Sequence, residues 1–289
     1  MSSLLIIGNG FDLHHNMKTK YWDYREFLLK NGKGDIVEAF EQRDESNKKY
    51  LWNELERQIG LVPYENAYCY LVNYADENWS DSYHHDFQYE IKKMMKYWPG
   101  IKDYLKGWIC SIEYTSPDKN IFDFIKKADC FLSFNYTNTL ENLYGIDKDK
   151  ITYIHGDFSI DDELILGHQN DDWYPEWDRN NHDEDVRLLE ASEMMDEHLK
   201  ATIKDVNSIM IKNKKFFNSC DHFDEIYVIG LSYNETDKPY LIKIAEMNNK
   251  ASWFFNWHTD DDFLAIDNYA KSIGLDWYKK INITKGLMG

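Results

Sequence analysis

The sequence predicts an α/β protein with a mainly parallel sheet, helices on both faces and a large helical insertion after the first strand. Short apolar strands alternate with helical patterns, which is the arrangement of Rossmann-like parallel sheets. Small or polar residues follow several of these strands, at the edge where such sheets bind ligands. We expect residues 1–289 to form a single domain, in which 20–127 are the helical insertion and 169–222 are a loop plus a long helix. With 43% apolar residues, a chain of 289 residues can bury a substantial core.

The first strand is predicted at Leu4–Ile7, an unbroken apolar run typical of a strand buried on both faces. It ends at Gly8-Asn9-Gly10, residue types that tolerate positive φ and suit a sharp turn. Where such a turn opens a helix, backbone N–H groups and the helix dipole favour a phosphate. Leu13 stands where a full dinucleotide-binding fingerprint has its third glycine, so an ordinary glycine turn is an equal alternative.

From about residue 20 to residue 127 the apolar residues recur at helical spacing, without a convincing strand. Pro99-Gly100 is expected to end or kink a helix. The many aromatic residues of this block are best explained as core. Helices are expected over 21–30, from Asp35 as N-cap, over 52–59, from Pro63, from about Asp81 and over 101–112.

The second half of the chain alternates strands with helices. Residues 169–185 are acidic and predict a surface loop or lid. Strands are expected at 130–134, 151–154, 163–166, 225–229 and, as the last strand, 251–256. Helices are expected over 140–143, 186–217, 236–247 and 260–273. If the strands are parallel neighbours, the polar clusters at their ends converge on one crevice, namely those at Gly8, Asn135, His155, Gly167 and Gly230.

Two of these strand ends carry side chains suited to catalysis. His155 follows a buried strand, where a histidine can act as a general base near neutral pH or can be a hydrogen-bonded core residue. Asn135 could hold a ribose hydroxyl, orient a water or cap a turn. Ser232 could bind a ribose or phosphate or cap a turn, and capping the next helix is an adequate explanation for Asp237. His168 has a similar setting, in which a core role is favoured.

Other chemistries fit the sequence less well. There is no G-x-S-x-G elbow, Walker lysine motif or H-E-x-x-H. The four cysteines are scattered, which excludes zinc-ribbon spacing and predicts small buried side chains in a reducing compartment. The net charge of −18 opposes a broad grip on nucleic acid. No run is long enough for a signal peptide core or a membrane span, which predicts a cytoplasmic protein. We expect four histidines to be solvated, namely His14, His15, His84 and His85.

Several of these motifs, taken in order, resemble those of the AbiH family of bacterial phage abortive-infection proteins. The segment Gly8-Asn9-Gly10-Phe11-Asp12-Leu13, followed by Tyr21 and Phe27, is similar to the start of that family. The resemblance covers nearly the whole chain. The later matching blocks are Ser133-Phe134-Asn135-Tyr136-Thr137, Ile154-His155-Gly156, Gly167-His168 and Ile229-Gly230-Leu231-Ser232 with Asp237 and Tyr240.

AbiH-like proteins look in turn like distant relatives of the sirtuin (SIR2-like) NAD-binding fold. This resemblance implies Asn135 and His155 as catalytic residues, with His155 as base, and NAD as ligand or substrate without a metal. It implies that Gly8 to Gly10 approach the pyrophosphate and that Ser232 holds a phosphate or the adenine-side ribose. The other residues expected to line the nucleotide site are Phe11, Asp12, Thr137, Gly156, His168, Gly230 and Asp237.

The chain departs from the sirtuin pattern at two places. Its scattered cysteines cannot build the four-cysteine zinc module of protein-deacylating sirtuins, which disfavours deacylation. Asn135 is followed by Tyr136-Thr137, not by the aspartate usual in sirtuin-like NADase motifs, so hydrolysis of NAD stays open.

The leading hypothesis is an antiphage protein that binds NAD or a related nucleotide and hydrolyses it by N-glycosidic cleavage. The alternative is a non-catalytic nucleotide sensor that engages a phage or host protein through 20–127 or 169–185. A nuclease toxin is disfavoured by the acidic charge. The expected partners are a nucleotide and a phage or host protein, with neither nucleic acid nor membrane, and the aromatic helical block is compatible with a homo-oligomer.

Overall fold

The computed structural model describes residues 1–42, 45–61, 89, 91–93, 95–160, 162–169, 193–194, 197–198, 200–220, 222–233 and 235–283. The helix expected from Pro63, the loop or lid at 169–185 (save 169), His84 and His85 lie outside these residues. The chain divides into two compact units. The first consists of Met1–Lys20, Lys106–Ile165 and Asp205–Gly289, and the second of Tyr21–Leu105 and Leu166–Lys204.

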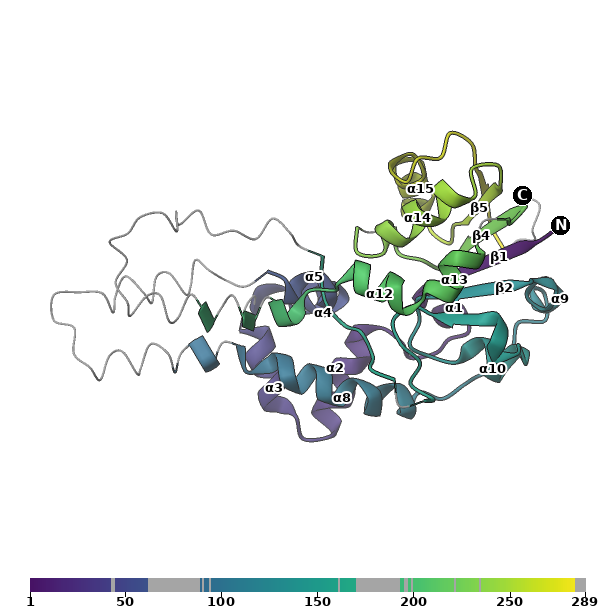
Figure 1. Ribbon diagram of the computed structural model, residues 1–289. Coiled ribbons are helices and arrows are strands. Elements are labelled where there is room, and N and C mark those ends of the chain that lie inside the picture. The colour runs from purple at the N-terminus through teal and green to yellow at the C-terminus, as the bar shows by residue number, and fades with distance from the viewer. Residues whose placement is uncertain are drawn as a thin grey trace, which may run out of the picture. The chain divides into compact units, whose positions relative to one another are not determined.

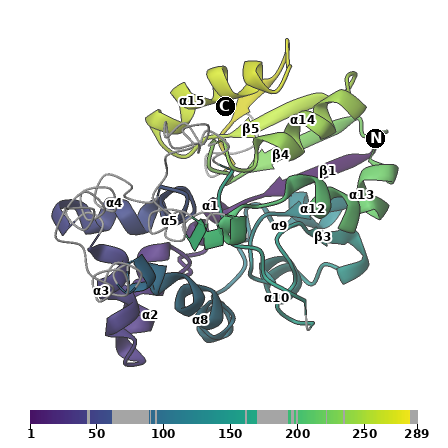
Figure 2. The ribbon, with the colours of Figure 1, turned by 60° about the vertical axis from the view of Figure 1, so that its left-hand side comes forward.

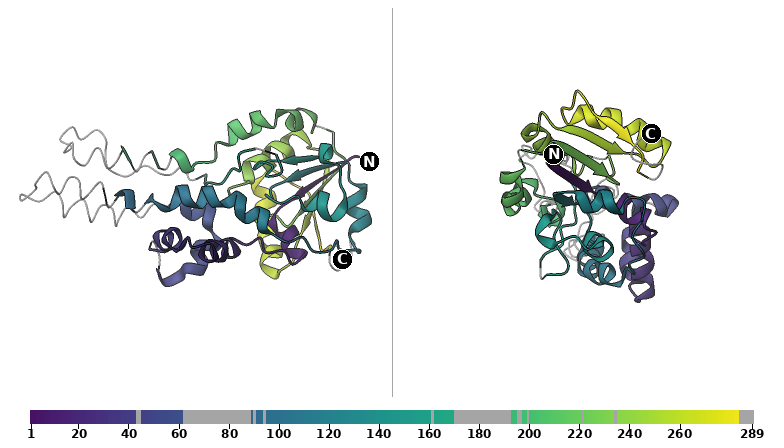
Figure 3. Two further views of the ribbon diagram at one scale, coloured as in Figure 1. Left: turned by 90° about the horizontal axis from the view of Figure 1, so that it is seen from below. Right: turned by 90° about the vertical axis from the view of Figure 1, so that its right-hand side faces the viewer.

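The first unit is built on a six-stranded sheet in the order β3-β2-β1-β4-β5-β6, and every neighbouring pair is parallel (Figures 1 and 3). This confirms the predicted Rossmann-like α/β class. The order reverses between β1 and β4, where parallel sheets form their ligand crevice. The strands are β1 (Ser3–Ile7), β2 (Cys130–Ser133), β3 (Ile151–Tyr153), β4 (Glu225–Ile229), β5 (Ser252–Asn256) and β6 (Lys279–Ile281).

Helices cover both faces of this sheet. On one face, alternate strand residues such as Leu4, Ile226 and Phe255 share an apolar core with α13, α14 and α15 (Figure 2). On the other face, Phe124 of α9 packs edge-on against Tyr227, with ring centroids 4.9 Å apart. The helices of this unit are α1 (Asn9–His14), α9 (Phe122–Lys127), α10 (Thr139–Tyr144), η2 (Lys148–Lys150), α12 (Val206–Lys212), α13 (Lys214–Ser219), α14 (Lys238–Met247) and α15 (Asp260–Ser272).

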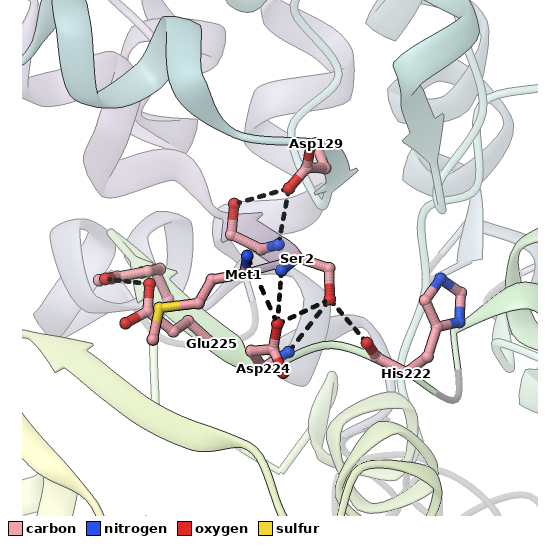
Figure 4. Close-up of polar contacts among 8 residues, drawn as sticks. Met1, Ser2, Asp129, His222, Asp224 and Glu225 are labelled. Carbon is pink, nitrogen blue, oxygen red and sulfur yellow. Dashed lines mark hydrogen bonds and ion pairs between the residues drawn. The ribbon is translucent and has the colours of Figure 1, made fainter.

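Two aspartates pin the amino end of β1 to its neighbouring strands (Figure 4). The backbone N–H of Ser2 donates to Asp224 Oδ2 at 2.7 Å, just before β4. The backbone N–H of Ser3 donates to Asp129 Oδ2 at 2.9 Å, just before β2. Ser2 Oγ adds a bond to the His222 carbonyl at 2.6 Å. These bonds favour the register of the three central strands at the edge opposite the predicted site.

At the carboxyl edge, β1 and β4 meet backbone to backbone through glycines. The N–H of Gly8 donates to Ile229 O at 3.0 Å, and that of Gly10 donates to Gly230 O at 2.7 Å. Gly230 has a φ of +66°, and a Cβ there would lie 2.2 Å from Phe11 N. A Cβ on Gly10 would lie 2.7 Å from Gly230 Cα. Glycine is therefore required at this contact because no side chain fits between the two segments.

The second unit is helical over its described residues and is held by a buried ionic cluster. The carboxylate of Glu41 accepts from Arg25 Nε at 2.5 Å and from Trp52 Nε1 at 3.1 Å, and it pairs with Lys48 Nζ at 2.8 Å. Burial raises the pKa of Glu41, but these donors outweigh burial and the net shift is downward.

The helices of the second unit are α2 (Tyr21–Lys30), α3 (Gly34–Glu41), η1 (Glu45–Asn47), α4 (Lys48–Asn53), α5 (Leu55–Ile59) and α8 (Tyr97–Ser111), whose last residues belong to the first unit. None of the described helices is long and apolar enough to span a bilayer.

Three element predictions are wrong. Residues 163–166 form no strand, although Ile165 N–H donates to His155 O at 2.9 Å. Residues 251–256 were expected to form the last strand, but β6 follows them. The sequence did not predict β6 because two of its three residues are lysines. The helix expected over 186–217 is interrupted, because Ile203 pairs with His168 in an isolated bridge.

Of the smaller expectations, some are confirmed and some need correction. Pro99-Gly100 lies in the first turn of α8, and a turn at Lys96 interrupts the helix just before it, as expected of a proline that cannot donate to the residue four positions earlier. Asp35 lies within α3, whose N-cap is Lys33. Cys220 is buried as expected, whereas Cys110 is exposed.

The glycine contact gives a direct test. We expect Gly230→Ala to destabilise the fold by about 1–2 kcal/mol for the left-handed backbone and by about 1–3 kcal/mol more for the overlap with Phe11. Gly274→Ala is the matched control, because Gly274 has a φ of +85° but no neighbour within 4 Å of an added Cβ. Chemical denaturation measures both, and equal losses would show that the close contact at Gly230 does not exist.

Candidate functional site

The predicted site residues lie beyond the carboxyl ends of β1, β2, β3 and β4, and all but one belong to the first unit. The exception is His168, which belongs to the second unit. There its ring Nε2 lies 3.1 Å from Thr202 Oγ1, and the His168 carbonyl accepts from Lys204 N–H at 2.8 Å. These contacts agree with the core role favoured for His168 by the sequence.

The turn after β1 uses its N–H groups within the protein. Besides the bonds of Gly8 and Gly10, the N–H of Phe11 donates to Gly8 O at 2.9 Å. Gly8 has a φ of −123°, so the expected positive φ is found across the contact, at Gly230, and not in this turn. The exposed Asn9 donates its side-chain amide to Thr19 O at 3.0 Å. Glycine is thus required at positions 8 and 10 because both pack closely against Gly230.

Asp12 of α1 is the centre of a buried polar cluster at the end of β2. Its side chain is 1% exposed. With the carboxyl ionised, Thr137 Oγ1 donates to Asp12 Oδ2, and Thr139 Oγ1 donates to Asp12 Oδ1 at 2.6 Å. The two threonine oxygens lie 3.0 Å apart. The segment after β2 therefore wraps the carboxyl group with hydroxyls.

The protonation of Asp12 is governed by its burial. Removal from water raises the pKa of this carboxyl to about 6, against the opposing effect of hydrogen bonds from Thr137 and Thr139. The Asn135 amide faces the same carboxyl and opposes the shift less strongly. Near neutral pH, Asp12 can therefore exchange a proton, as groups at functional sites often do.

Asn135 is a buried amide without matching partners. Its side chain is 4% exposed, and among the described residues neither Nδ2 nor Oδ1 has a partner with hydrogen-bond geometry. Its amide lies near the Asp12 carboxyl and, as a weak donor, lowers the pKa of that group less than the threonines do, but the contact is not a well-formed hydrogen bond. The turn-capping alternative for this residue therefore fails. Buried polar groups without a partner are rare and mark places where a ligand or water binds.

His155 faces a carboxylate from another strand end. Its Nε2 lies 3.4 Å from Asp237 Oδ1, and both residues are buried. Asp237 stands at the N-cap position of α14, but its side chain makes no capping bond there. Capping therefore does not account for Asp237, which instead lies within ion-pair distance of the His155 ring.

The segment after β2 separates the predicted residues into two groups. The rings of Phe134 and Tyr136 contact the His155 ring, with centroids 5.5 Å and 6.1 Å away. The alternate residues Asn135 and Thr137 face Asp12 instead. By these contacts, the segment after β2 lies between Asp12 on the Asn135 side and His155 on the other.

The remaining predicted residues have mixed surroundings. Ser232 is exposed, in the loop after β4. Gly156 is buried with a φ of +93°, and a Cβ there would lie 2.4 Å from Glu163 O, so this glycine allows residues 163–165 to approach. Phe11 packs within the unit, where its carbonyl lies 2.7 Å from His15 Nδ1.

Sequence reasoning missed two polar positions. Thr139 completes the cluster at Asp12, and its spacing of two from Thr137 was the available signal. His15 is buried rather than solvated, with Nε2 2.6 Å from Tyr144 Oη, and burial lowers its pKa. His14 pairs with Asp118 at 2.8 Å. In the described part of the chain, no three acidic, histidine or cysteine side chains gather as a metal site would require.

Comparison with known proteins gives one match. A family model described as "Bacteriophage abortive infection AbiH" matches residues 4–257. Neither the curated proteins nor the solved structures include a match to the chain.

The unmatched amide of Asn135 predicts an unusual mutational effect. Asn135→Leu should stabilise the protein by about 1–3 kcal/mol, because it removes a buried polar group that lacks a partner. The matched control is Asn248→Leu. Asn248 is equally buried, but its amide bonds Phe223 N at 3.0 Å, Ile244 O at 3.0 Å and Cys220 O.

We expect Asn248→Leu to lower the free energy of unfolding by about 2 kcal/mol or more, since it leaves Phe223 N–H and Cys220 O without their partner. Urea denaturation of both variants gives the comparison. A loss of stability in Asn135→Leu as large as that in Asn248→Leu would show that Asn135 is a structural residue.

Proposed function

The chain belongs to the AbiH family of bacteriophage abortive infection proteins, and on this basis we propose that it binds NAD or a related nucleotide and hydrolyses its N-glycosidic bond. The family implies a role in phage defence by abortive infection. Removal of a central cofactor from the infected cell would be a direct way to perform that role. The nucleotide and the reaction are our proposal.

The observation that carries the proposal is the buried, unmatched amide of Asn135. It stands at the carboxyl end of β2, next to the point where the strand order reverses, which is where parallel sheets bind nucleotides. An amide offers both a donor and an acceptor, so it suits a hydroxyl or a bound water. Binding such a group would recover the free energy lost by burying Asn135.

His155 and Asp237 supply the groups for proton transfer. We place the proton of the neutral imidazole on Nε2, the nitrogen that faces Asp237, so that Nδ1 is the nitrogen that accepts a proton in the proposed reaction. In the proposed reaction the bond from C1′ of the ribose to the nicotinamide nitrogen breaks, and nicotinamide leaves with the bonding electron pair. A water oxygen bonds to C1′, and its proton passes to His155. The products are nicotinamide, ADP-ribose and a proton.

This reaction requires the nucleotide to lie across the end of β2, because Asn135 and His155 face opposite sides of the segment that follows it. Phe134 and Tyr136 flank Asn135 in the sequence and both contact His155, which keeps the two groups near each other. A ligand spanning the strand end could therefore use Asn135 for binding and His155 for the proton.

The activity test is release of nicotinamide from NAD by the purified protein, followed by chromatography. We expect His155→Ala and Asn135→Ala each to lower the rate by about 100-fold or more, the usual contribution of a positioned acid–base group. His222→Ala and Asn249→Ala are matched controls, because both residues are exposed and precede β4 and β5, at the amino edge of the sheet.

The outcomes separate the hypotheses. Full turnover in both site variants would overturn the residue assignment. Calorimetry that detects NAD binding without any conversion, over a range of pH and protein concentration, would favour a non-catalytic nucleotide sensor. Absence of both binding and conversion would overturn the proposal.

A second test concerns Asp237 as a positioning residue for His155. Asp237→Asn keeps the size of the side chain but removes the charge that favours a proton on Nε2. We expect kcat to fall at least about tenfold with KM nearly unchanged. A rise in KM with kcat unchanged would instead make Asp237 a binding residue.

A further inference from the structure

Asp12, Thr137 and Thr139 form a closed ring of three oxygen–oxygen contacts. Thr139 Oγ1 lies 2.6 Å from Asp12 Oδ1 and 3.0 Å from Thr137 Oγ1, and Thr137 Oγ1 bonds Asp12 Oδ2. Each contact needs one hydrogen, and each threonine hydroxyl carries one. An ionised Asp12 leaves the ring with two hydrogens for three contacts. A neutral carboxylic acid supplies the third.

The surroundings of the ring also oppose a negative charge. No lysine or arginine among the described residues forms an ion pair with Asp12, which is buried. The titratable groups that face it are Tyr114, whose pKa is raised by burial and slightly by Asp12, and Glu141 beyond that phenol. An ionised carboxyl here would therefore be buried without a balancing charge, which is costly.

We propose that Asp12 is a specificity residue of the ligand site: as a neutral carboxylic acid it closes this ring, and it must be in this neutral form for an anionic nucleotide to bind beside Asn135. The ligand part of this inference rests on the function proposed above. Ionisation of Asp12 removes the third hydrogen from the ring and places a negative charge next to the bound anion. Nucleotide binding at neutral pH is therefore accompanied by proton uptake at Asp12.

The first experiment needs no nucleotide. Asp12→Asn places an N–H where the acid has its O–H, so the ring stays closed at every pH. Because the pKa of Asp12 is raised to about 6 in the folded state from 3.8, the folded state holds its proton more tightly. Relative to the variant, wild-type stability is greatest below about pH 4, falls as the pH rises to about 6 and is constant above that.

Expressed as a ratio, the unfolding equilibrium constant of the wild type should rise roughly a hundredfold relative to Asp12→Asn between pH 4 and pH 7, since each pKa unit is a factor of ten. Asp123→Asn, an exposed aspartate of α9, is the control for loss of one charge. If Asp12→Asn does not fold, the ¹³C shift of the Asp12 carboxyl in the wild type gives the same answer. If either method shows that Asp12 ionises near pH 4, the proposed hydrogen-bonded ring is wrong.

The second experiment measures binding of ADP-ribose by calorimetry at pH 7.5, in two buffers with different ionisation enthalpies. ADP-ribose is the probe because the proposed reaction does not consume it and its charge is only negative. We expect the wild type to take up close to one proton for each ADP-ribose bound, and Asp12→Asn to take up none. Above pH 6, wild-type affinity should fall by up to tenfold for each pH unit relative to the variant.

The two experiments fail independently. Binding of ADP-ribose without proton uptake would overturn the coupling and leave the proposed function intact. If neither NAD nor ADP-ribose binds to the wild type or to Asp12→Asn, the proposed function fails, and the stability measurement still decides whether the ring exists.

Discussion

The hydrogen bond from Gly10 to the Gly230 carbonyl, 2.7 Å long, is the constraint on which the carboxyl edge depends. It joins the segment after β1 to the segment after β4 at the point where the strand order reverses. Three glycines allow this approach because a Cβ on any of them would overlap the opposite backbone. The approach sets where α1 begins, and the position of α1 in turn places Asp12 against the threonines after β2.

Much of the sheet could be predicted from the sequence because its central strands are apolar on both faces. Residues 4–7, 130–134 and 225–229 stood out as continuous apolar runs, and each became a strand in a fully parallel sheet. The failures lie where tertiary context overrides the local pattern. β6 contains two lysines at a sheet edge, and 163–166 is apolar because it packs beside His155 without pairing in the sheet.

The candidate site was predictable as a set of strand ends but not as a geometry. The order of the motifs identified Asn135, His155 and Asp237, yet only the structure pairs His155 with Asp237 across the sheet edge. The segment after β2 lies between Asp12 on the Asn135 side and His155 on the other, which spacing alone did not reveal. The glycines of the first turn suggested a phosphate cradle, whereas their N–H groups are bonded within the protein.

Two pairs of buried polar residues lie at this edge, His155 with Asp237 and Asp12 with Asn135. They differ in whether each side chain has a partner that offsets the cost of burial, and this difference bears on the function of the edge. His155 Nε2 and Asp237 Oδ1 lie 3.4 Å apart, within ion-pair distance, which offsets part of the cost of burying them. Asp12 and Asn135 lack such compensation, since one is a buried acid with a raised pKa and the other an unmatched amide. Folding alone would be better served by apolar or amide side chains at these two positions. In the proposed function, a ligand recovers this free-energy cost by supplying the missing partners. The Asn135 side of β2 would then be the binding side, and the His155 side the source of proton transfer.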